Sequence, residues 1–210
     1  MSHPSLRLLL ARHGETVWNR EGRYQGQRDS ALTERGEAQA RCLATRLADE
    51  SIAVAYASDL RRAWQTAEVI AAGRNLSVTR DASWREMSYG AWEGLTRAEI
   101  QERFPDAWQR RLANPAGIAP PGGESPLDLQ RRVVGALHAL AERHPGQSVL
   151  VVTHGGALRA LACWLFDVDL NDPASSRLGL TNCGLSCVRY DGAAWQVDCW
   201  NDVSHLDGRP

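Results

Sequence analysis

The sequence lacks several features that would point to particular classes of protein. It contains no lysine, so all 24 of its basic side chains are arginine, and the formal net charge of the 210-residue chain is only −1. Such a balance gives no strong field to favour a nucleic acid or a membrane surface as the main partner. We expect most arginines to lie on solvated faces, and expect a functional role only for those at the ends of strands.

Cysteine pairs and long apolar segments are also missing. The five cysteines are scattered and include no Cys-x-x-Cys pair, so we expect no zinc site and a reduced, cytoplasmic setting. No N-terminal segment is apolar enough for a signal peptide or a membrane span. With this length and no repeat, residues 1–210 are expected to form one domain.

Short apolar runs predict strands at residues 6–11, 52–57, 76–79 and 148–153, and a closing hairpin at 185–190 and 194–200. Helical patterns fall between them. The predicted helices start at Thr33, at Ser58-Asp59, at the capping box from Thr96 to Glu99, at Ser125-Pro126 and after His154. The alternation predicts an α/β fold: a three-layer α/β/α sandwich whose mostly parallel sheet has an antiparallel edge.

Two stretches carry no regular pattern. Residues 14–30 are polar and contain glycine, and residues 114–124 contain three prolines and three glycines. Long irregular loops in compact domains are often functional. We therefore expect the first to border a site and the second to cover a cleft.

Five polar side chains follow predicted strands or the turn after them: Arg12, His13, Arg62, Glu86 and His154. Ligands of α/β sheets bind at the carboxyl ends of the strands, so a parallel sheet would bring all five to one edge. Together they suit phosphoryl transfer. Arginines bind phosphate oxygens through two parallel hydrogen bonds, and a neutral imidazole can attack phosphorus. A carboxylic acid can protonate the leaving alkoxide, so this chemistry needs no metal or other cofactor.

The N-terminal motif supports this chemistry. The first strand runs into Arg12-His13-Gly14-Glu15-Thr16, and Trp18-Asn19, Gln25-Gly26 and Leu32-Thr33-Glu34-Arg35-Gly36 follow. In this pattern, and in later motifs, nearly the whole chain resembles the phosphoglycerate mutase-like group of the histidine phosphatase superfamily.

The resemblance implies roles for particular residues. His13 matches the nucleophile that becomes phosphohistidine, and Glu86 matches the proton donor. The phosphate pocket is matched by Arg12, Arg62 and His154, and the positions that line the phosphate or substrate cleft by Asn19, Gln25, Gly26, Tyr89 and Gly155. Dimers are common in that family, so the resemblance also allows a homodimer.

The leading hypothesis is a metal-independent phosphatase that hydrolyses small-molecule phosphomonoesters. The first alternative is a phosphoglycerate mutase, which shares the catalytic set. Mutases of that family that depend on bisphosphoglycerate carry a longer insertion between the acid and the second histidine, and the short stretch here favours the phosphatase. The second alternative, a non-catalytic module that binds a phosphate ligand, is disfavoured because all five core residues are present.

Other candidates have simpler explanations. We expect Arg61 to be solvated, Glu93 to support its loop, and His138 and His144 to be surface residues. Four aromatic residues either form a wall of the cleft or pack in the core: Trp18, Tyr24, Tyr89 and Trp92. Three arginines either bind an acidic substrate or are solvent-exposed: Arg20, Arg23 and Arg28. His205 either folds back toward the cleft or belongs to a frayed tail.

Overall fold

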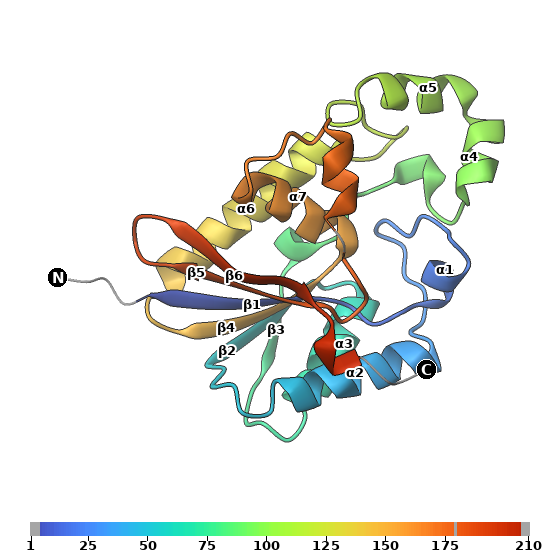
Figure 1. The fold of residues 1–210 in the computed structure, drawn as a ribbon. Helices are drawn as coiled ribbons and strands as arrows, with labels where there is room; N and C mark the ends of the chain where they lie inside the picture. Colours follow the sequence, from blue (N-terminus) through green and yellow to red (C-terminus); the bar gives the residue numbers. More distant parts are fainter. Residues whose placement is uncertain (1–4, 179, 207–210) are drawn as a thin grey trace.

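The computed structural model describes residues 5–178 and 180–206, and its central feature is a six-stranded sheet in the order β3-β2-β4-β1-β5-β6 (Figure 1). The strands are β1 (Leu6–Arg12), β2 (Val54–Ala57), β3 (Val78–Arg80), β4 (Ser148–Thr153), β5 (Leu185–Tyr190) and β6 (Trp195–Asp202). The pairs among β3, β2, β4 and β1 are parallel, whereas β5 and β6 are antiparallel. The predicted parallel sheet with an antiparallel edge is confirmed.

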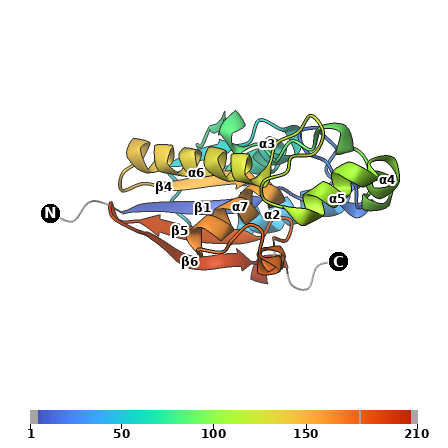
Figure 2. The same ribbon diagram turned by 90° about the horizontal axis from the view of Figure 1, so that it is seen from above.

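Helices cover both faces of this sheet, as Figure 2 shows from above. The pair α2 (Glu34–Arg46) and α3 (Arg61–Ala71) packs on one face, and α6 (Pro126–Arg143) and α7 (Gly155–Leu165) pack on the other. On β1, Leu8 and Leu10 belong to the core under α6 and α7, while Leu9 and Ala11 belong to the core under α2 and α3. Because both faces are buried, the strand is apolar at successive positions. The three-layer prediction is confirmed.

Beyond the carboxyl ends of the parallel strands lie three more helices. These are the short α1 (Val17–Arg20), α4 (Arg97–Arg103) and α5 (Pro105–Ala113), and α4 and α5 project past the sheet (Figure 1). The helices α4 and α5 share a small core, in which Ile100 and Trp108 pack with Trp92. In residues 5–178 and 180–206, no helix is both long and apolar enough to cross a membrane.

Two local predictions were wrong, and one helix was missed. Residues 14–30 were expected to lack regular structure, but Thr16 and Asn19 form a capping box that starts α1. Ser58-Asp59 was expected to cap the next helix; instead α3 starts at Arg61 without a side-chain cap, because the carboxylate of Asp59 pairs with Arg85. The helix α5 was not predicted, although Pro105 occupies its favoured first position.

Candidate active site

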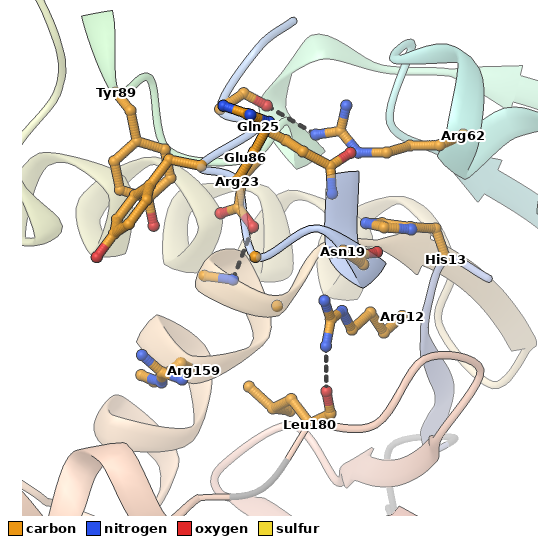
Figure 3. Close-up of a pocket in the computed structure, with 15 residues that line it drawn as sticks. Arg12, His13, Asn19, Arg23, Gln25, Arg62, Glu86, Tyr89, Arg159 and Leu180 are labelled. Carbon is orange, nitrogen blue, oxygen red and sulfur yellow. Dashed lines mark hydrogen bonds between the residues drawn. The ribbon is translucent and has the colours of Figure 1, made fainter. Parts of the chain in front are cut away.

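A cavity of about 350 Å³ opens where β1 and β4 end, beside the start of α3 and the loop that carries Glu86 (Figure 3). Its lining comes from the N-terminal loop, the strand ends and the start of α7. The lining residues are Arg12, His13, Asn19, Gly22, Arg23, Tyr24, Gln25, Gly26, Arg62, Glu86, Tyr89, Gly155, Gly156, Arg159 and Leu180. Of the ten residues predicted for the site, nine line this cavity and the tenth, His154, lies directly behind it.

His13 is buried at the end of β1 and faces the cavity. Its Nδ1 lies 2.7 Å from the carbonyl oxygen of Gly14, which can only accept a hydrogen bond. Nδ1 therefore carries the proton of the neutral ring, and Nε2 keeps a free electron pair. Burial, together with the positive charges of Arg62 and Arg12, holds the pKa of His13 well below its ordinary value of 6.5. The ring is thus neutral at physiological pH, and the free electron pair of Nε2 is available toward the cavity.

His154 lies behind His13, with the two ring centroids 5.1 Å apart and nearly edge to face. It is fully buried, and neither of its ring nitrogens has a hydrogen-bond partner among the described residues. Burial and the positive charge of Arg62 lower the pKa of His154 well below its ordinary value. A neutral ring with an unused N–H is suited to donate to an oxyanion held against His13.

Arg12 and Arg62 converge on the same end of the cavity. The Nη1 of Arg12 donates to the carbonyl of Leu180 at 2.5 Å, and the Nη2 of Arg62 donates to the carbonyl of Gly26 at 2.7 Å. In each guanidinium the buried Nε–H lacks a protein partner in the described part of the chain. Buried donors are normally satisfied, and a bound phosphate would satisfy these.

Glu86 holds its carboxylate at the centre of the cavity (Figure 3). Its Oε1 accepts the main-chain N–H of Met87 at 2.8 Å, and its Oε2 accepts that of Gly156 at 2.9 Å. Two main-chain donors from two different segments thus fix both oxygens. The neighbouring Glu93 lies outside the cavity and accepts the N–H groups of Gln27 and Tyr89, which agrees with the supporting role predicted for it.

Asn19 is held by the first helical turn after the N-terminal motif. Its Oδ1 accepts the N–H of Thr16 and the Nδ2–H of Asn182, both at 3.2 Å. Since the oxygen is occupied, the amide nitrogen is the end that remains to donate into the cavity. Asn182 also donates to the carbonyl oxygen of His13 at 2.9 Å, so one side chain fixes both residues.

Aromatic side chains form one flank of the cavity. Tyr24 and Tyr89 line it and meet edge to face, with ring centroids 4.9 Å apart. Burial raises the pKa of Tyr89, so its phenol stays protonated. Trp92 is instead buried against Trp108, and Trp18 does not line the cavity. Of the four aromatic candidates, only the tyrosines take part in the wall.

The segment 114–124, expected to cover the cleft, contributes no lining residue. It packs behind the Tyr89 loop, where the carbonyl of Pro121 accepts the N–H of Ala91. His205 does turn back toward the fold, but its Nε2 contacts the carbonyl of Cys183 at 3.0 Å rather than the cavity. His138 is exposed as predicted, whereas His144 is half-buried against the hydroxyl of Tyr56.

Several lining residues escaped prediction. Arg159 lies in the middle of a helical pattern, and its only signal is its spacing of four residues from Gly155. Leu180 precedes a strand that is distant in sequence, and nothing near it suggests a site. Arg23 was left open between substrate and solvent, and it lines the cavity while pairing with Glu99 at 2.9 Å.

Within residues 5–178 and 180–206, no three side chains of histidine, cysteine, aspartate or glutamate are grouped so that they could hold a metal ion. The cavity is instead lined by four arginines and by Glu86.

Known proteins resemble this chain over most of its length. The model of the histidine phosphatase superfamily (branch 1) matches residues 8–203. Phosphoserine phosphatase 1 of Hydrogenobacter thermophilus is 40% identical over 201 residues, which cover 96% of this chain and 94% of that protein. A protein named probable phosphoglycerate mutase GpmB, from Cronobacter sakazakii, is 41% identical over 209 residues, covering 96% and 95%. The structure of Bacillus stearothermophilus YhfR superposes with a TM-score of 0.90 at 36% identity, covering 96% of this chain and 100% of that one.

Proposed function

The chain belongs to the histidine phosphatase superfamily, and from that premise we propose that it hydrolyses phosphomonoesters of small metabolites through a phosphohistidine formed on His13. The observation that carries the proposal is the state of His13. Its ring is neutral, its Nδ1 is bonded to the carbonyl of Gly14, and it faces a cavity that Arg12, Arg62 and Glu86 also line.

In the first step, Nε2 of His13 attacks phosphorus. The N–P bond forms as the bond from phosphorus to the ester oxygen breaks, and protonated Glu86 gives its proton to the leaving alkoxide. Arg12 and Arg62 hold the non-bridging oxygens, with Asn19 and His154 as further donors. Gln25, Gly26, Tyr89 and Gly155 complete the walls.

In the second step, Glu86 acts as a base. It takes a proton from a water molecule as the water oxygen bonds to phosphorus and the N–P bond breaks. Inorganic phosphate leaves, and His13 and protonated Glu86 are restored. Since the arginines and His154 stabilise the charge, none of these steps requires a metal ion or an organic cofactor.

The experiment is phosphate release from a panel of phosphomonoesters with a chelator present, coupled to trapping of the intermediate. We expect chelator-resistant release, and an acid-stopped reaction in which mass spectrometry finds one phosphoryl group on His13. The His13→Ala variant should lose both while remaining folded. The control is His138→Ala, which changes an exposed histidine outside the cavity and should behave as the wild type. Turnover retained by His13→Ala would contradict the mechanism.

A mutase is the second candidate, because the relative from Cronobacter sakazakii carries that name. A mutase must keep its phosphohistidine from water. Here Arg159, which lines the cavity, is an exposed residue, so water reaches the site from that side, which favours hydrolysis. Interconversion of 2- and 3-phosphoglycerate without phosphate release would instead assign the protein to the mutases.

The state of the cysteines bears on the compartment in which the enzyme acts. All five are free thiols, and four of them are buried. Unpaired buried cysteines suit a reducing compartment, so we propose a cytoplasmic enzyme acting on phosphorylated metabolites.

A further inference from the structure

Arg159 differs from the other three arginines that line the cavity. Arg12, Arg23 and Arg62 each donate to main-chain carbonyls, and the latter two also pair with carboxylates. Arg159 lines the cavity and is exposed. It makes no hydrogen bond or ion pair through its side chain within the described ranges 5–178 and 180–206. Among the described residues, its guanidinium is therefore the cavity cation that no protein group binds.

The position of Arg159 separates it from the phosphate end. It lies on α7 four residues after Gly155, on the same side of the helix and about 6 Å farther along the axis. Gly155 itself lies against Arg12, since a Cβ there would come within 3.3 Å of the Nε. Figure 3 shows the guanidinium of Arg159 across the cavity from His13 and below Tyr89. The cavity therefore has one cation at the phosphate end and a second one about a helical turn farther along α7.

We propose that Arg159 binds the carboxylate of a substrate whose phosphate lies against His13, so that the enzyme selects small phosphorylated acids. This inference rests on the proposed function. The planar guanidinium matches a carboxylate through two parallel hydrogen bonds, and a cation with no protein partner gains most from an anionic one.

The cavity limits the size and charge of this substrate. Its volume is about 350 Å³, and the offset along α7 corresponds to a few carbon atoms. A neutral sugar hydroxyl would leave the charge of Arg159 uncompensated. A second phosphate is the other anion to consider, and the experiment includes it as a separate arm.

The test compares two substrates that differ only in the carboxylate. 3-Phosphoglycerate has it, and glycerol 3-phosphate has a hydroxymethyl group in its place. The wild type should show at least a tenfold higher kcat/KM for the acid. Arg159→Met should lower kcat/KM for the acid about 10- to 100-fold, mainly through KM, since a hydrogen bond to a charged group has about that value. The kcat/KM for glycerol 3-phosphate should change less than about twofold, as expected for loss of an interaction made with the carboxylate alone.

Two variants serve as controls. Arg159→Lys keeps the charge but not the planar guanidinium that makes two parallel hydrogen bonds, and it should retain part of the preference for the acid. Arg110→Met removes an exposed arginine of α5 that does not line the cavity, and should change neither substrate. Because Arg159 is exposed, the thermal unfolding temperature of Arg159→Met should match that of the wild type.

Three outcomes would overturn the proposal. The first is a wild type with equal kcat/KM for the two substrates. The second is an equal loss of kcat/KM for both substrates in Arg159→Met, which would mean that the arginine binds the phosphate or supports the fold. In the third, 2,3-bisphosphoglycerate would depend on Arg159 more strongly than 3-phosphoglycerate, which would assign the position to a second phosphate.

Binding measurements separate this proposal from the proposed function. Calorimetry with His13→Ala requires no turnover. We expect 3-phosphoglycerate to bind this variant more tightly than glycerol 3-phosphate, and Arg159→Met to remove the difference. If the wild type hydrolysed neither ester, the proposed function would be wrong. The carboxylate site would still be supported by the difference in affinity between the two compounds. Equal affinities of His13→Ala for the two compounds would overturn the site itself.

Discussion

The main-chain N–H of Gly156 donates to Oε2 of Glu86 at 2.9 Å, so the start of α7 fixes the proposed proton donor. A Cβ at residue 156 would lie 2.1 Å from Oε1 of the same carboxylate. We therefore expect Gly156→Ala to displace Glu86 and lower kcat by about 10²-fold or more, the range for a misplaced general acid. Steady-state kinetics with any accepted phosphomonoester provide the measurement.

The matched control for this change is Gly135→Ala on α6, where no atom beyond the neighbouring residues and the backbone of the same helix lies within 4 Å of the added Cβ. Alanine favours the helix by up to about 1 kcal/mol there, so the control should be at least as stable as the wild type and fully active. Wild-type kinetics in Gly156→Ala would show that the carboxylate tolerates displacement, and would weaken the role given to Glu86.

Glu86→Gln tests that role directly. The amide keeps the shape of the side chain but has no acidic proton to transfer, so kcat for an alkyl phosphate should fall about 10²- to 10⁴-fold. An aryl phosphate such as p-nitrophenyl phosphate needs little protonation of its leaving group, so its phosphorylation of His13 should be much less affected. The rate of the first nitrophenol burst measures this step. An equal loss with both esters would place Glu86 outside proton transfer.

The strand ends could be predicted because each depends on a local pattern. Arg12-His13 and His154 follow apolar runs, and any parallel sheet brings such ends to one edge. Arg62 and Glu86 lie farther along, and the resemblance to a family singled them out from Arg61 and Glu93. The structure then brings these side chains to one cavity or, for His154, directly behind it.

The missed features depend on long-range pairing or weak local signals. Leu180 reaches Arg12 because β5 pairs antiparallel with β1, across 168 residues of sequence. Nothing near Leu180 encodes that partner. The helix α1 is only four residues long, and its capping box uses Asn19 where glutamate or glutamine is usual. Arg159 belongs to an ordinary amphipathic pattern, so only the fold reveals where it lies.

Asn182 illustrates a long-range contact with a measurable consequence. It donates to the carbonyl of His13 at 2.9 Å and to Oδ1 of Asn19 at 3.2 Å. Asn182→Ala should lower kcat/KM about tenfold and the free energy of unfolding by about 1–2 kcal/mol, because it leaves both acceptors without this donor. Asn182→Asp should lower both quantities further, since its carboxylate would face the carbonyl oxygen of His13 and Oδ1 of Asn19. Kinetics and urea unfolding check both variants, and equal behaviour of the two would contradict the donor role.

The two buried histidines predict how stability depends on pH. The pKa values of His13 and His154 are held well below 6.5, by burial first and by nearby arginines second. Below pH 6.5 the unfolded chain therefore binds protons that the folded chain does not bind. The free energy of unfolding should fall as pH drops from 6.5, by up to about 1.4 kcal/mol per pH unit for each histidine. The loss should stop only when the pH falls below the folded pKa values.

Urea unfolding between pH 7.5 and 5 measures this slope above the range where most carboxylates titrate. His154→Phe replaces a fully buried ring that has no hydrogen-bond partner in the described residues, and it should flatten the slope by about one proton. His138→Phe, at an exposed position, should leave it unchanged. An unaltered slope in His154→Phe would mean that the folded protein protonates His154 as readily as the unfolded chain does. The neutral state proposed for His154 as a donor to the phosphate would then be wrong.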